Sequence, residues 1–210
     1  MAIAQNPITG QMRKSYANVN TYVLNGQNVV SSKAFNRKDK NSEAQKAQRA
    51  SFKIIGDVWG WVGSFAEAGL LNLPQTQSPY NAFMAINLPA AIDNSGEAPV
   101  LDYPKLQISK GTLTAVEVIN TSVSDSVLTI VYDSQKDFPR VETTDVITVL
   151  VKTTRGAVYF KRKARGAEHE DSLEVQMRNV MLEDVECVYL YTTSADGKKV
   201  SNSVYVNVNP

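Results

Sequence analysis

The chain has 210 residues, of which 43% are hydrophobic and 20% charged, and this balance excludes a generally disordered protein. The formal net charge is +1, so no overall field draws the chain to nucleic acid or to a membrane surface. A single cysteine, Cys187, excludes an internal disulfide framework and a zinc site built from cysteines.

Residues 1–41 are expected to form an extended arm. Two short β-like runs, 19–24 and 27–31, flank Asn25-Gly26, and this dipeptide between apolar runs predicts a tight hairpin. Because an isolated two-stranded hairpin is marginal in water, we expect the arm to be ordered only in an assembly. The first ten residues lack the basic and apolar regions of a secretory signal, so we expect the protein to be made in a bacterial cytoplasm and to be soluble there.

Residues 42–104 are predicted to contain two helices and a linker. Ser42 followed by Gln45 is a capping-box pattern that opens the first helix, which is expected to end near Gly69. Its apolar stripe is predicted to consist of Phe52, Ile55, Trp59, Val62, Ala66 and Leu70.

The second helix is predicted to begin at Ser78-Pro79 and to end at Pro89. Its buried side is expected to consist of Tyr80, Phe83, Met84 and Ile86. The turn-rich residues 93–104 are expected to be a linker.

Residues 105–210 are predicted to form an all-β domain. The expected strands are 106–109, 113–120, 127–132, 145–152, 157–162, 173–178, 186–193 and 200–208, and Asp196-Gly197 is expected to turn the closing hairpin. Short strands without intervening helices favour an immunoglobulin-like or fibronectin-like β-sandwich, with Leu128, Val149, Tyr189 and Val204 among its buried residues. The predicted fold class is therefore mostly β with a helical N-terminal part (α+β).

A basic segment is the first candidate for an interaction surface. Only Asp39 and Glu43 oppose its seven basic residues, a local charge of +5; these are Lys33, Arg37, Lys38, Lys40, Lys46, Arg49 and Lys53. One interpretation is contact with nucleic-acid phosphates or with an acidic protein. The other, which we favour, is a solvated loop and helix face, because the last three residues lie at helical spacing opposite the apolar stripe.

Two further features are weighed in the same way. Trp59 and Trp61 cannot share one helical face, so one is expected in the core, and the other packs on the β domain or faces a partner; Trp61 is therefore a possible interaction residue. The charged cluster 161–165 is expected to make surface salt bridges. His169, between two glutamates, is expected to be an exposed side chain without a catalytic role.

The sequence contains none of the common catalytic motifs. The sequence has no phosphate-binding glycine loop, no nucleophile elbow and no His-Glu-x-x-His pattern. We therefore expect a protein that is not an enzyme and that uses no cofactor and no metal.

Several segments resemble a family of uncharacterised proteins of about 200 residues from Bacteroidota, their phages and their mobile elements. These segments are residues 1–10, the run Val29-Val-Ser-Ser-Lys33, the helix start 45–52, the segment 78–83 and the closing hairpin 194–205. The resemblance implies a non-enzymatic protein with an immunoglobulin-like C-terminal region and a link to phages.

These observations favour a structural protein of a bacteriophage particle, in capsid decoration, neck or tail. Polar arms of this kind commonly become ordered against neighbouring subunits, so the expected partners are further copies and other virion proteins, with no membrane partner. Two alternatives remain: a cytoplasmic nucleic-acid-binding accessory protein that uses residues 33–53, and a surface adhesion module, which the missing signal sequence disfavours.

Overall fold

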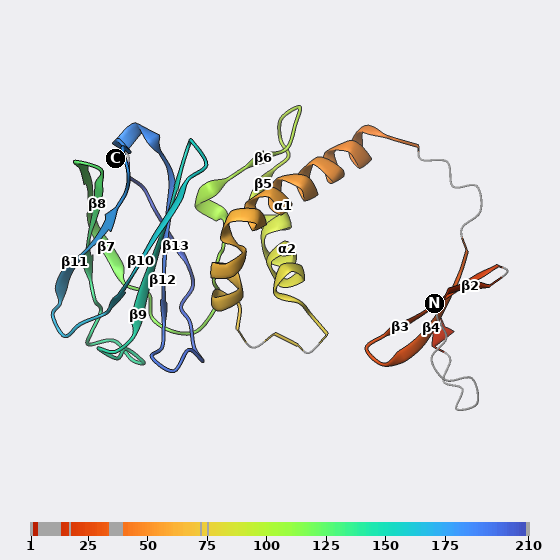
Figure 1. Cartoon of the computed structure of the whole chain (residues 1–210), viewed down its shortest axis with the longest axis horizontal. Coiled ribbons are helices and arrows are strands. Elements are labelled where there is room, and N and C mark those ends of the chain that lie inside the picture. The colour runs from red at the N-terminus through yellow and green to blue at the C-terminus, as the bar shows by residue number, and fades with distance from the viewer. Residues whose placement is uncertain are drawn as a thin grey trace. The chain divides into compact units, whose positions relative to one another are not determined.

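The computed structural model describes residues 2–3, 14–16, 18–33, 40–71, 73–74 and 76–208. The chain forms two compact units, Met1–Glu43 and Ala44–Pro210, which are described separately below (Figure 1). Antiparallel sheets and two helices make the protein mostly β with some helix, in agreement with the prediction.

The first unit contains a four-stranded antiparallel sheet. Its strands are β1 (Ala2–Ile3), β2 (Lys14–Tyr16), β3 (Val19–Leu24) and β4 (Gln27–Ser32), in the order β1-β4-β3-β2. The predicted hairpin between β3 and β4 is confirmed, and its turn residues Asn25 and Gly26 have φ angles of 50° and 78°. Positive φ at both turn positions matches the right-handed twist of the strands. The predicted arm therefore contains a larger sheet than the single hairpin we expected.

In the second unit, α1 (Glu43–Gly69) is the first predicted helix, but the start of its apolar stripe is wrong. The buried residues are Ser51, Ile55, Val58, Val62, Ala66 and Gly69, whereas Phe52 is exposed and Trp59 is half-buried. Ile55, Val62 and Ala66 belong to both sets, and the predicted Leu70 is also buried, so the period and most of the stripe were correct. Spacing alone does not show how wide a stripe the neighbouring elements cover.

Helix α2 (Pro79–Ala90) begins as predicted, because the Ser78 hydroxyl accepts a hydrogen bond from the Asn81 amide at 3.2 Å. Pro89 lies inside the last turn instead of ending the helix, and Tyr80 is exposed, contrary to the prediction. Phe83 and Met84 are buried as expected. The predicted linker that follows contains β5 (Ile92–Asp93), β6 (Val100–Leu101) and the short helix η1 (Tyr103–Lys105).

The expected strand 106–109 does not form, and the backbone of this segment is instead bonded in part by the side chain of Asn87. Its side chain is fully buried; Nδ2 donates to the Gln107 carbonyl at 2.9 Å, and Oδ1 accepts from the Gln107 amide at 2.8 Å. This side chain thus supplies the hydrogen bonds that a neighbouring strand would otherwise supply.

Two antiparallel sheets form the rest of the second unit. The strands are β7 (Glu117–Ser124), β8 (Val127–Asp133), β9 (Val146–Thr153), β10 (Val158–Ala164), β11 (Glu170–Gln176), β12 (Val185–Thr193) and β13 (Val204–Val206), with η2 (Leu182–Asp184) before β12. One sheet has the order β10-β9-β12-β13 and the other β11-β8-β7. Strands β8, β9, β10 and β12 lie within two residues of their predicted bounds, whereas β7 starts four residues later than predicted and β13 is shorter than predicted.

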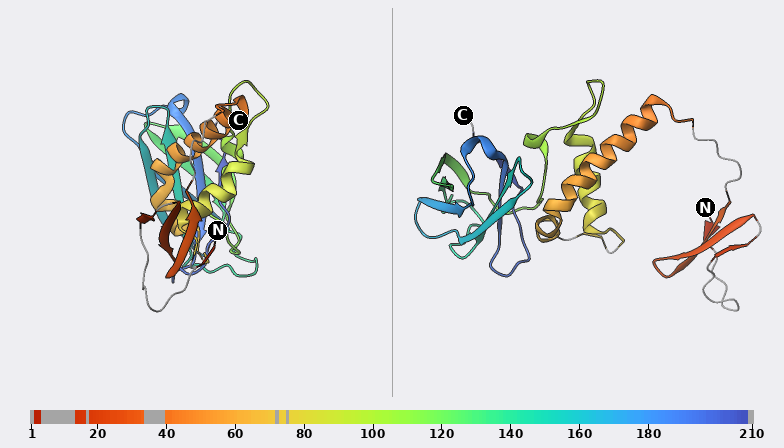
Figure 2. Two further views of the ribbon diagram at one scale, coloured as in Figure 1. Left: turned by 90° about the vertical axis from the view of Figure 1, so that its right-hand side faces the viewer. Right: turned by 45° about the horizontal axis from the view of Figure 1, so that its top comes forward.

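The sheet that contains β9 and β12 is covered on both faces. Side chains from both sheets, including Leu128, Val149 and Leu190, fill one hydrophobic core. On the other face, Leu150 and Tyr189 pack with residues of α1 and α2 in a second core. The two helices lie beside this sheet, on the side away from the three-stranded sheet (Figures 1 and 2). Three of the four predicted buried residues are buried, and the fourth, Val204, is half-buried. The helical segment and the β region, which the prediction separated after residue 104, thus share one unit.

Candidate partner-binding site

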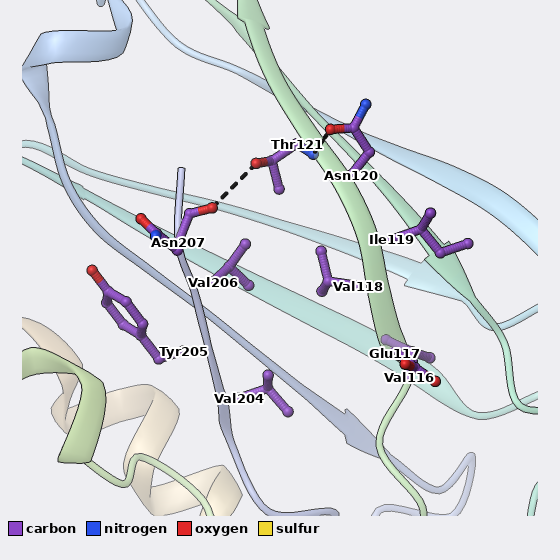
Figure 3. A pocket seen from close by; sticks show the side chains of 10 residues that line it. All are labelled: Val116, Glu117, Val118, Ile119, Asn120, Thr121, Val204, Tyr205, Val206 and Asn207. Carbon is purple, nitrogen blue, oxygen red and sulfur yellow. Dashed lines mark hydrogen bonds between the residues drawn. The ribbon is translucent and has the colours of Figure 1, made fainter. Parts of the chain in front are cut away.

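The candidate site is a slot between the last strands of the two sheets, β7 and β13. Within the residues that the structure describes, no strand pairs with the outer edge of either one. The slot has a volume of about 570 Å³ and is lined by residues 116–121 and 204–207 (Figure 3). This volume lies in the range of pockets that bury a small ligand or a few side chains.

Both ends of the slot are closed by hydrogen bonds between the two chain segments. At one end the Leu113 amide donates to the Val200 carbonyl at 2.9 Å, beside a parallel bridge between Leu113 and Ser201. At the other end the Thr121 hydroxyl donates to the Asn207 carbonyl at 3.3 Å (Figure 3). The two chain segments are therefore joined by hydrogen bonds on either side of the slot.

The floor of the slot is apolar. Val116 and Val206 are buried, and Val118 and Val204 are partly buried against the core between the sheets. Val118 and Val206 lie between the two strands, whereas Ile119 is at the outer rim and 55% exposed (Figure 3). An exposed isoleucine beside a valine-lined hollow is an apolar surface that a partner side chain could cover.

The edge of β7 is protected against pairing with a long strand. A β-bulge interrupts its register between Val118 and Asn120. The Asn120 side chain also accepts a hydrogen bond from the Thr121 amide at 2.8 Å (Figure 3). Bulges and locally satisfied amides are devices that keep sheet edges from pairing. The slot is thus shaped for inserted side chains rather than for an added strand.

Acidic residues lie beside one end of the slot. Glu117 on β7, Asp133 on β8 and Glu170 on β11 are in register across three neighbouring strands. Carboxylates opposite one another on neighbouring strands repel, so this row of three acidic residues lowers the stability of the sheet locally. Phe138 is 56% exposed in the adjoining loop, which also carries the highly exposed Asp137.

The predicted basic segment is divided between the two units. Lys33 and Lys40 belong to the first unit and are exposed, while Arg37 and Lys38 lie outside the described residues. In the second unit, exposed Lys46, Arg49 and Lys53 lie at helical spacing on α1, as the solvated-face interpretation predicted. The second unit therefore presents three of the seven basic residues on one helix face.

Residue Trp61 is half-buried and packs on the β region, one of the two outcomes that we expected. Its ring centroid lies 6.4 Å from that of Tyr189, and the Lys152 ammonium is 5.4 Å from the Trp61 ring. Lys152 pairs with Glu186, and the Tyr103 hydroxyl donates to the same carboxylate. Burial is the main cause that raises the pKa of the Tyr103 phenol above its ordinary value. Trp61 also lines a hollow of about 440 Å³ between α1 and β6.

The cluster 161–165 was predicted to make surface salt bridges, and this is wrong for Arg165. Its side chain is fully buried, 3.4 Å from the buried Asp145 carboxylate, and it donates to the Thr114 carbonyl at 2.6 Å. Lys163 does make the expected kind of contact, with Asp171. His169 is exposed and 3.5 Å from Asp137, in line with its expected environment.

The sequence did not lead us to predict the slot between β7 and β13. Valines alternate along both segments, at positions 116 and 118 and again at 204 and 206, and this pattern indicated two half-buried strands. The pattern carries no information on which strands end their sheets, because strand order depends on contacts distant in the sequence. Gly111 was the other available signal: a Cβ there would lie 2.0 Å from the Val200 carbonyl oxygen, so glycine is required for the approach of the two segments.

The described residues contain neither a cluster of metal-ligating side chains nor a membrane-spanning helix. No group of three or more histidine, cysteine, aspartate or glutamate side chains is arranged to hold a metal ion there. No described helix combines the length and the apolar character needed to cross a bilayer.

Comparison with known proteins places the chain in a family. Neither the curated proteins nor the solved structures give a significant match to it. A family model, described as a family of unknown function (DUF6266), matches residues 11–207, which include most of the first unit and nearly all of the second. The chain therefore belongs to the DUF6266 family.

Proposed function

We propose that this protein is a non-enzymatic structural protein that works through protein–protein assembly contacts, as a component of a bacteriophage particle. The main support for an assembly role is the valine-lined slot between the edge strands β7 and β13, where Ile119 is exposed. An apolar hollow with a polar rim is typical of a surface that a protein partner covers. The phage link rests on the sequence resemblance.

We further propose that the second unit contains an immunoglobulin-like or fibronectin-like sandwich. With β7 taken as the first strand, the three-stranded sheet joins the first, second and fifth strands, and the other sheet joins the third, fourth, sixth and seventh. Immunoglobulin domains likewise join their third, sixth and seventh core strands in one sheet, and variable types add the strand that follows the third. Such sandwiches are frequent binding scaffolds, which supports the assembly role by analogy of fold alone.

Analysis of purified particles tests the particle role. We expect mass spectrometry to detect the protein in phage particles at a fixed copy number. We also expect Ile119→Asp, which places a charge at the slot rim, to lower that copy number at least several-fold. The matched control is Ser122→Asp, on the same exposed strand but outside the slot, and it should leave the copy number unchanged. Particles that lack the protein would contradict the proposal.

The second candidate is a nucleic-acid-binding accessory protein, favoured by the row Lys46, Arg49 and Lys53 on α1. Binding through phosphate contacts weakens steeply as salt rises, because each contact releases counterions. If DNA binds at physiological salt and reversal of Arg49 and Lys53 to glutamate abolishes binding, this candidate replaces the assembly role. We expect no such binding.

A further inference from the structure

The two units carry opposite formal charges. Residues 1–43 contain six basic and two acidic side chains, a charge of +4, and the whole chain has +1, so residues 44–210 carry −3. Part of the negative charge lies beside the slot, in the row Glu117, Asp133 and Glu170 and in exposed Asp137. Opposite charge on two surfaces steers their association and selects their orientation.

The first unit also has exposed apolar side chains that suit the slot. Tyr22 and Leu24, two residues apart on β3, point to the same face of the strand and are 37% and 51% exposed. Of the residues in this unit whose side chains are described, 14–15, 18–33 and 40–43, only Thr21 and Val29 are buried. Exposed apolar side chains on a small sheet are stabilised when a second surface covers them.

We propose that the slot of one copy binds the N-terminal unit of a second copy, with Tyr22 and Leu24 on the valine floor and the basic side chains facing the acidic row. This inference rests on the proposed assembly function and names the partner of the same site. The two contacting surfaces differ, so each contact is heterologous, and every copy can both donate its N-terminal unit and accept that of another copy.

Charge-reversal variants of the full chain, studied by sedimentation velocity at low and high salt, test the inference. We expect wild type to show a mass that rises with protein concentration and falls with added salt. Lys33→Glu with Lys40→Glu reverses charge on the N-terminal unit, and Glu117→Lys with Asp137→Lys reverses it beside the slot; each double variant should stay monomeric. Glu174→Lys with Glu183→Lys makes the same charge change at exposed positions outside the slot and should associate like wild type.

Mixing the two monomeric variants gives the decisive measurement. One retains an intact N-terminal unit and the other an intact slot, so an equimolar mixture should form a 1:1 complex and nothing larger. Wild type that is monomeric at every concentration, a mixture that stays monomeric, or acceptor variants that associate like wild type would each overturn the inference. These results would leave the particle role standing if the protein is found in particles, because that role is tested separately.

Discussion

The two larger sheets of the second unit differ in how they are covered, and the difference explains their sequences. In β9 every residue from Ile147 to Val151 is buried, because one face meets the other sheet and the opposite face meets the helices. In β8 buried and half-buried residues alternate, since only one face of that sheet meets a core. A continuous apolar run thus marks a strand covered on both sides, even in an antiparallel sheet.

The largest expected effect comes from breaking the buried ion pair at the end of the covered sheet. Asp145→Ala would leave the buried Arg165 guanidinium without its partner, and we expect a loss of about 3–5 kcal/mol of unfolding free energy. Urea denaturation measures it. The double variant Asp145→Leu with Arg165→Met should regain most of this loss; if it is no more stable than Asp145→Ala, the uncompensated charge is not the cause.

Two substitutions compare the stability contributed by the helix-covered face of β9 with that contributed by the outer face of β8. Leu150 is 1% exposed and packs with residues of the helices, so Leu150→Ala should cost about 2–5 kcal/mol. Thr129→Ala, on the outer face of β8, should stay within about 0.5 kcal/mol of wild type. Equal effects of the two substitutions in denaturant titrations would mean that the helix layer contributes little to the stability of the sheet.

The contact between α2 and residue 107 tests how the helix layer is joined to the β region. Asn87→Ala would remove both side-chain partners of the backbone amide and carbonyl of half-buried Gln107 and should cost about 1–3 kcal/mol. Asn81→Ala, on the exposed side of the same helix, is the matched control and should change stability by less than about 0.5 kcal/mol. A neutral Asn87→Ala would show that water replaces both hydrogen bonds.

The smallest effect concerns the reactivity of the single thiol. Cys187 lies under the helix layer, and burial raises the pKa of its thiol to about 12. At pH 8 the thiolate is therefore scarce, and a maleimide should label native protein far more slowly than protein in urea. Ser122→Cys, on the open sheet, should add one rapidly labelled thiol. Fast labelling of Cys187 in native protein would indicate that the helices detach readily.

Local chemistry made several elements predictable. Asn25-Gly26 supplies the positive φ angles of the first hairpin, and Ser78 with Pro79 caps and starts α2. These features depend on residues within a few positions of each other. The basic segment was partly predictable for the same reason: helical spacing placed Lys46, Arg49 and Lys53 on one exposed face.

Other features were decided only when distant segments met. The burial of Arg165 depends on Asp145 and Thr114, 20 and 51 residues away, and nothing in the run 161–165 distinguishes it from its exposed neighbours. The same holds for the slot, whose two walls are about 85 residues apart in sequence. Periodicity determines which side chains of a strand are apolar, but the order of strands in a sheet, and hence which edges stay open, follows from the free energy of the whole packed unit.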